Sequence, residues 1–215
     1  MEVLNFFIAN YSEIVYRTIE HIFIVFLAVG FAIVFGVSMG IYITQHKRVA
    51  NVVLYIASII ITIPSIALFG LMIPILSLIN QGIGYLPAII AVFLYSLLPI
   101  IRNTYTAIVN IDPALREAAN GMGMRSAQRL FRVEIPLSIP IIMAGVRYAT
   151  VLNIGVTAIA AYIGAGGLGT FISQGISQSD STKLIVGAIS VSVLAIIADY
   201  FLLFVQNKAT SKGLK

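Results

Sequence analysis

The stretch Ile22 to Ile43, IFIVFLAVGFAIVFGVSMGIYI, decides the class of fold, because it is apolar throughout and contains no charged residue. The polar sequence Gln45-His46-Lys47-Arg48 closes it. A helix needs about 20 mostly apolar residues to cross the hydrocarbon core of a bilayer. The stretch therefore predicts a membrane-spanning helix, and the remaining sequence is interpreted as that of a membrane protein.

The composition of the whole chain supports this interpretation. Of its 215 residues, 60% are hydrophobic and 10% are charged, whereas soluble domains carry about 25% charged residues. So few charges could not cover a soluble fold of this length, so a lipid bilayer is the expected solvent. The chain has no cysteine, which excludes disulfides, thiolate metal sites and cysteine nucleophiles. His21 and His46 stand alone, so we expect no metal site.

Four further apolar runs predict four further spans. They cover about 50–71, 84–101, 141–163 and 184–205. Together with 22–43, they predict an all-α fold, a polytopic transmembrane helical bundle of five spans in a single domain over 1–215.

Two places leave a sixth span or a re-entrant segment open. The second run stays apolar to about Ile79 but contains Pro64 and Pro74, so we expect its span to end near Leu71 in a turn or a short half-helix. The segment 163–176 is the other place where an additional membrane segment can lie.

The distribution of Lys and Arg predicts the orientation. With the N-terminus outside, only Arg17 and Lys183 fall in outer segments. Ten basic residues then fall inside: Lys47, Arg48, Arg102, Arg116, Arg125, Arg129, Arg132, Lys208, Lys212 and Lys215. Cytoplasmic loops carry such an excess, so we expect the N-terminus outside and the C-terminus in the cytoplasm. The net charge of +5 thus reflects topology, and no nucleic-acid partner is expected.

The spans carry few charges at depth. Asp199 lies about two-thirds along the fifth run, and Arg147 lies near the inner end of the fourth, where it can snorkel to the interface. Proton pumps and voltage sensors need ionisable groups inside the membrane. The sequence therefore disfavours an ion-driven carrier or channel. A membrane-embedded enzyme is disfavoured too, because no cluster of nucleophile, base or metal ligands is apparent.

One loop, 102–140, differs from the others. It holds eight of the chain's 21 charged residues and lies inside by the charge distribution. Asp112-Pro113 is a favourable helix start, and Gly121 and Gly123 provide a stop. We expect a short helix there and a second one from about Ser126 to Val133 that ends before Pro136.

The first short helix has an apolar stripe. Leu115, Ala118, Ala119 and Met122 follow the spacing of one helical face, with the carboxylate of Glu117 beside them. Two interpretations stay open on the residues alone. The stripe either packs under the protein's own spans or forms a docking surface for a soluble partner.

A motif around this helix resembles a known family. Glu117-Ala118-Ala119, three residues, Gly123, nine residues and then Val133-Glu134-Ile135-Pro136 resemble the cytoplasmic EAA loop of ABC importer permeases. The family pattern is E-A-A, three residues, G, nine residues and I-x-L-P. This chain departs from it at Val133 and Ile135, which are conservative aliphatic changes.

The resemblance extends over nearly the whole chain. The stretches Thr62 to Ser65, Leu97 to Tyr105 and Ile163 to Gly169 look like permeases of osmoprotectant importers, which carry glycine betaine, carnitine, choline or related compounds. The resemblance implies a type I, MetI-like permease fold in a bacterial plasma membrane. The alternatives are a permease of the same class for another small solute, such as an amino acid, and, less favoured, an ion-driven carrier or channel.

The resemblance also implies the partners and the roles of residues. The pathway is shared with a second, identical or paralogous, permease subunit, two cytoplasmic ATPase subunits bind ATP, and an extracellular binding protein delivers the solute. This chain then has no catalytic residue and no cofactor of its own. The residues implied to couple it to the ATPase are Leu115, Glu117, Ala118, Ala119, Met122 and Gly123.

Prolines and glycines are the candidates for a gate or hinge, because broken helices are common at transporter sites. Pro64 and Pro99 are expected to break helices. The tract from Gly164 to Gly169, with Gly164, Gly166, Gly167 and Gly169, also fits G-x-G-x-x-G. We reject nucleotide binding there, because that fingerprint requires a preceding strand and a later acidic residue. Close packing or a turn at the outer mouth is the expected role.

Overall fold

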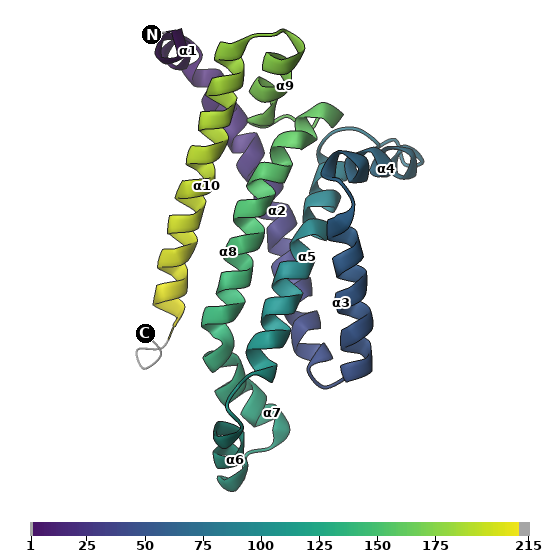
Figure 1. The fold of residues 1–215 in the computed structure, drawn as a ribbon, viewed down its shortest axis with the longest axis vertical. Coiled ribbons are helices and arrows are strands. Elements are labelled where there is room, and N and C mark those ends of the chain that lie inside the picture. The colour runs from purple at the N-terminus through teal and green to yellow at the C-terminus, as the bar shows by residue number, and fades with distance from the viewer. Residues whose placement is uncertain (1, 211–215) are drawn as a thin grey trace.

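The computed structural model describes residues 2–210 and is all-helical (Figure 1). Its long helices lie side by side and alternate in direction: α2 (Tyr11–Ile43), α3 (Lys47–Thr62), α5 (Tyr85–Val109), α8 (Ile135–Ile159) and α10 (Ser181–Ala209). In the described part, four helices are long and apolar enough to cross a membrane, or five spans if a bent pair forms one. The predicted class, an all-α polytopic bundle, is confirmed.

Helix α5 lies at the centre of the bundle. It is buried along most of its length and packs against α2, α3 and α8. Gly36 and Gly40 let α2 approach it closely, because a Cβ atom at Gly40 would lie 2.6 Å from Cβ of Thr104. Small residues one turn apart are a common means of close helix contact in membranes. The core therefore forms around α5, and the other helices are positioned relative to it.

The second predicted span, 50–71, differs from the structure. Helix α3 ends at Thr62, and α4 (Ser65–Ser77) continues after a bend of 100°. The break lies at Pro64, whose preceding residue Ile63 has the extended backbone that proline imposes. The Ile63 carbonyl accepts a hydrogen bond from the Tyr95 hydroxyl, so the broken end is satisfied. Pro74 lies inside α4 without ending it.

The loop that the sequence predicts over 102–140 is shorter in the structure. Helix α5 continues to Val109, and α8 begins at Ile135. Between them lie α6 (Pro113–Gly121), α7 (Ser126–Arg129) and a π turn, η1 (Leu130–Glu134). At the bottom of Figure 1, α6 and α7 project beyond the bundle.

The predicted helix end before Pro136 is wrong. From Ser126 to Ile163 the chain forms 38 continuous helical residues. Pro136 lies in the first turn of α8, where a missing N–H is tolerated. The π turn before it shifts the hydrogen-bond register, with the Ile135 N–H bonded to the Leu130 carbonyl.

Besides α4, the opposite end of the bundle holds three shorter elements (Figure 1). They are α1 (Glu2–Ala9), the 3₁₀ turn η2 (Ala160–Ile163) and α9 (Gly169–Ser177). Helix α9 occupies the region where a sixth span was left open, but nine residues fall far short of the roughly 20 that a span needs. It packs against the start of α10 instead.

Arg147 of α8, near the end of its span, pairs with Asp199 of α10. Its guanidinium binds both carboxylate oxygens of Asp199 on α10, at 2.8 and 3.0 Å, and also Gln206 Oε1 at 3.2 Å. Charged groups inside a bilayer are costly unless they are paired. The pair therefore helps to fasten α10, in which Val186 and Gly187 are the buried residues, to α8.

Candidate functional site: the two ends of the bundle

Helix α6 begins and ends as its sequence predicts. The Asp112 carboxylate accepts a hydrogen bond from the Ala114 N–H at 2.9 Å, and Pro113 occupies the first turn. After the helix, Gly123 has a φ of +76°, which strains any residue with a Cβ. The Met124 N–H then bonds back to the Ala119 carbonyl at 3.2 Å. The chain therefore leaves α6 through a sharp turn at Gly123.

The predicted apolar stripe divides into two faces. Ala119 is 1% exposed and faces the protein's own chain, whereas Leu115 is 45% and Met122 69% exposed. Glu117, Ala118 and Gly123 are exposed as well. One residue of the stripe thus packs inward and the others face outward, and docking on a soluble partner stays a prediction. We call the outward residues Leu115, Glu117, Ala118 and Met122 the α6 surface.

A buried carboxylate anchors α6 and α7 to the bundle. Glu134 is 5% exposed, and its Oε1 accepts a hydrogen bond from Arg129 Nε at 3.0 Å. Arg116 Nε lies 3.2 Å from the same oxygen as an ion pair, without hydrogen-bond geometry. Arg116 Nη2 also donates to the Ile108 carbonyl at 2.5 Å, and Arg129 Nη1 donates to Asn120 Oδ1 at 2.8 Å.

Sequence reasoning did not identify this anchor. Glu134 lies inside the Val133 to Pro136 motif, at a position that the family pattern leaves unspecified. The signal that marks it is a lone carboxylate among basic residues: Arg125, Arg129 and Arg132 precede it. A carboxylate in such a position is expected to pair.

At the other end of the bundle, the glycine tract forms a turn that only glycine permits without strain. Gly164, Gly166 and Gly167 have φ values of +75°, +73° and +73°. A Cβ atom at Gly169 would lie 1.9 Å from the Ala158 carbonyl oxygen. The tract therefore serves close packing and a tight turn, as expected for this position.

Glu20 of α2 holds the tract in place. Its Oε2 accepts hydrogen bonds from the Gly167 N–H at 3.0 Å and from Arg17 Nη1 at 2.9 Å, and its Oε1 accepts one from the Tyr85 hydroxyl at 2.5 Å. The neighbouring His21 is fully buried, with Nε2 3.0 Å from the Ile154 carbonyl. Neither residue was selected from the sequence, because no local spacing links them to a tract so distant in the chain.

The two candidate prolines behave differently. Pro64 lies at the bend between α3 and α4, as predicted. The expectation that Pro99 breaks its helix is wrong, because α5 continues through it. Pro99 is buried, and α8 presses against it at Gly145, where a Cβ atom would lie 2.9 Å from the Pro99 carbonyl oxygen. Neighbouring helices can keep a span continuous across a proline.

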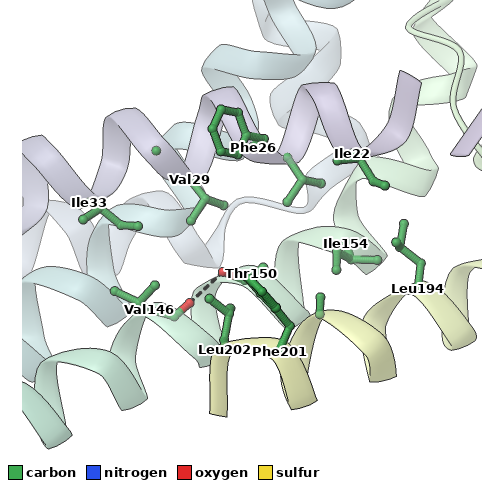
Figure 2. A pocket seen from close by; sticks show the side chains of 13 residues that line it. Ile22, Phe26, Val29, Ile33, Val146, Thr150, Ile154, Leu194, Phe201 and Leu202 are labelled. Atoms are coloured by element: carbon green, nitrogen blue, oxygen red, sulfur yellow. Dashed lines mark hydrogen bonds between the residues drawn. The ribbon is translucent and has the colours of Figure 1, made fainter. Parts of the chain in front are cut away.

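Two cavities between the long helices are apolar. One, of about 320 Å³, lies between α2, α8 and α10, and Figure 2 shows its aliphatic and aromatic lining with Thr150 as the polar side chain. The Thr150 hydroxyl is already bonded to the Val146 carbonyl. The other, of about 620 Å³, lies between α2 and α5 and is lined by Phe31, Phe35 and Phe93. The first cavity does not suit a charged solute, because desolvation there has no compensating partner.

The chain matches the family model described as "Binding-protein-dependent transport system inner membrane component" over residues 32–211. It is 52% identical over 215 residues to the "Osmoprotectant import permease protein OsmW" of Salmonella typhimurium, which covers all of both chains. It is 42% identical to the "Glycine betaine/carnitine/choline transport system permease protein OpuCB" of Bacillus subtilis, over 100% of this chain and 96% of that protein.

A solved structure shares the fold. A chain of the MetNI methionine ABC transporter in an inward-facing conformation superposes with a TM-score of 0.81, covering 92% of this chain and 97% of that chain. At 23% sequence identity, this likeness concerns the fold alone. It confirms the fold predicted by resemblance.

We predict that Glu20→Ala frees the glycine tract. Hydrogen bonds to a charged group contribute about 1.5–3 kcal/mol, so amide exchange in a peptide covering 164–169 should accelerate roughly tenfold or more. Glu13→Ala is the matched control, because Glu13 lies 3.7 Å from Arg17 and does not bond the tract. Equal exchange in both variants, measured by hydrogen–deuterium exchange mass spectrometry, would contradict the role of Glu20.

Proposed function

The chain belongs to the family of binding-protein-dependent transport system inner membrane components, and from this membership we propose that it forms the translocation pathway of an importer for glycine betaine, carnitine and choline. As a member of that family it is a multi-pass, non-catalytic permease of the membrane, and a separate ATPase binds ATP. The system depends on a solute-binding protein.

The solute proposal depends on one observation. Several relatives that align with nearly the full length of this chain, at 40–52% identity, are named for osmoprotectants, glycine betaine, carnitine or choline. The methionine transporter shares the fold at 23% identity. This likeness gives no support for methionine as the solute of this chain. The three osmoprotectants share a trimethylammonium group, so one pathway can serve all three.

Deleting the gene should abolish the uptake of these solutes. We expect the uptake of radiolabelled glycine betaine, carnitine and choline to fall to the background level. Uptake should return when the chain is supplied again. Methionine uptake is measured in the same cells as the control. Loss of methionine uptake with unchanged uptake of the three osmoprotectants would refute the solute proposal.

We propose that α6 and α7 face the cytoplasm, with the N-terminus outside. The excess of Lys and Arg supports this orientation. The start of α3 carries Lys47 and Arg48 and lies at the same end of the bundle as α6 and α7 (Figure 1). The glycine tract and α9 then lie on the outer side, where the binding protein delivers solute.

The absence of cysteine from the chain makes this orientation simple to test. Ser126→Cys and Ser177→Cys are nearly isosteric changes at exposed positions of the two ends. In intact cells, a membrane-impermeant maleimide should label Ser177→Cys alone, and Ser126→Cys should react only after permeabilisation. The reverse pattern would show that the orientation is inverted.

We propose that the α6 surface docks on the ATPase and transmits its movement. Its exposed aliphatic side chains lie around a small residue, Ala118, which permits close approach by another protein. Glu117 beside it can accept charge-assisted hydrogen bonds from the partner. Gly123 gives α6 its sharp exit, and Ala119 with the Glu134 anchor keeps α6 attached to the bundle. Pro64 and the glycine tract are proposed as hinges at the outer end.

A larger side chain on the α6 surface should uncouple the complex without unfolding it. Ala118→Gln keeps good helix propensity but obstructs close approach. Blocking a central interface contact costs ~2 kcal/mol or more, so ATP hydrolysis stimulated by solute-loaded binding protein should fall about tenfold or more. The thermal midpoint of the permease should stay unchanged.

The matched control is Ala127→Gln, an exposed alanine on α7 outside the α6 surface. It should retain stimulated ATP hydrolysis. If the complex with Ala118→Gln hydrolyses ATP and imports solute as the unmodified complex does, the α6 surface has no coupling role.

We also propose that the pathway is completed by a second permease subunit. Neither apolar cavity described above is a polar passage across the bundle. Helix α10 and one face of α2 present large apolar side chains outward, among them Phe31, Phe35 and Phe204. These faces are available to lipid and to a second subunit.

A further inference from the structure

A polar cavity lies where α6 and α7 meet the bundle, and the proposed transport function leaves it unused. Its volume is about 440 Å³. The turn between α2 and α3, the end of α5, α6, α7 and the π turn all contribute to its walls. Its charged and hydroxyl-bearing lining includes Lys47, Tyr105, Arg116, Ser126, Arg129 and Glu134.

The cavity carries excess positive charge. Three cationic side chains line it, Lys47, Arg116 and Arg129, against one carboxylate, Glu134, so three positive charges minus one negative charge leave two. Glu134 is buried, and both arginines already engage one of its oxygens. Lys47 is exposed and forms no ion pair with any residue in 2–210.

The two arginines are held in place, and each keeps a guanidinium nitrogen that can still donate to a ligand. Arg116 is fixed by the Ile108 carbonyl and Arg129 by Asn120, in addition to Glu134. Within the part of the chain that the structure describes, Arg116 Nη1 and Arg129 Nη2 form no hydrogen bond. A preorganised guanidinium matches the oxygens of a phosphate group, and ammonium and hydroxyl groups add further donors.

The cavity lies beside the ends of two apolar helices, where we expect the lipid headgroups. Helix α2 ends at Ile43 and α3 begins at Lys47, so the turn that borders the cavity lies where two apolar helices end. Ile108, Val109 and Leu130 provide an apolar part of the wall. An amphiphile with a phosphate at one end and hydrocarbon at the other suits this combination.

We propose that the cavity binds a phosphate group, that of an anionic phospholipid headgroup from the adjacent leaflet. Inorganic phosphate shares the recognised chemistry and is the other source. Bound there, the phosphate joins Lys47 at the start of α3 to Arg116 on α6 and Arg129 on α7. The ligand would thus tie the projecting helices to the bundle through a contact that the protein alone does not make.

The test uses the full chain in neutral detergent and two single substitutions. Lys47→Gln removes a charge that lines the cavity, and Arg48→Gln removes the neighbouring charge, which does not line it. Dihexanoyl phosphatidylglycerol, dihexanoyl phosphatidylcholine and inorganic phosphate are titrated separately, and binding is followed by ³¹P line broadening. These measurements do not depend on which solute is carried.

We expect saturable binding of phosphatidylglycerol, weakened roughly fivefold by Lys47→Gln, as expected for one basic residue near an anionic lipid, and less than twofold by Arg48→Gln. If inorganic phosphate competes at equal concentration, the site takes free phosphate, and the proposal of a phosphate pocket still holds. Equal weakening by both substitutions would mean general surface attraction and would overturn it. Unchanged binding in Lys47→Gln, or absence of saturable binding, would also overturn it.

Discussion

The buried carboxylate of Glu134 is the interaction on which the projecting end of the molecule depends. It receives Arg116 from α6 and Arg129 from α7, and it lies at the base of α8. Leaving a buried charge without partners is strongly destabilising, so the three side chains hold one another in place. A nine-residue helix is marginal alone, and α6 is further attached by the hydrogen bond from Arg116 to the Ile108 carbonyl and by the buried Ala119. Charge pairing at Glu134 adds to these contacts in orienting the short helices relative to the bundle.

Features that depend on local sequence were predictable. A run of apolar residues shows a span because length and hydropathy are properties of the run itself, and Asp112-Pro113 marks a helix start by local capping. Prolines show the limit of this reasoning. Pro64 ends a helix at the exposed end of the bundle, whereas Pro99 is buried inside a continuous one. The residue type is the same, and the packing of neighbouring helices decides the result.

Pairings between distant residues could not be predicted from one sequence. Arg147 and Asp199 lie 52 residues apart, so only the fold brings the two partners together. Glu20 accepts a hydrogen bond from Gly167, which lies 147 residues away in the chain. Nothing in the sequence around either residue indicates that they are in contact. The division of the α6 stripe, with Ala119 inward, also depends on where the Glu134 anchor places the helix.

The continuous helix from Ser126 to Ile163 has a mechanical consequence. It runs from the projecting end, through α8, to the 3₁₀ turn just before Gly164 (Figure 1). At a rise of 1.5 Å per residue, the 25 residues of α8 form a rod about 38 Å long. A rod of that length, tilted by about 5° at its base, carries its tip sideways by about 3 Å. The glycine turn sits at the tip of this lever arm, so a small rotation at one membrane surface becomes a displacement of atomic size at the other.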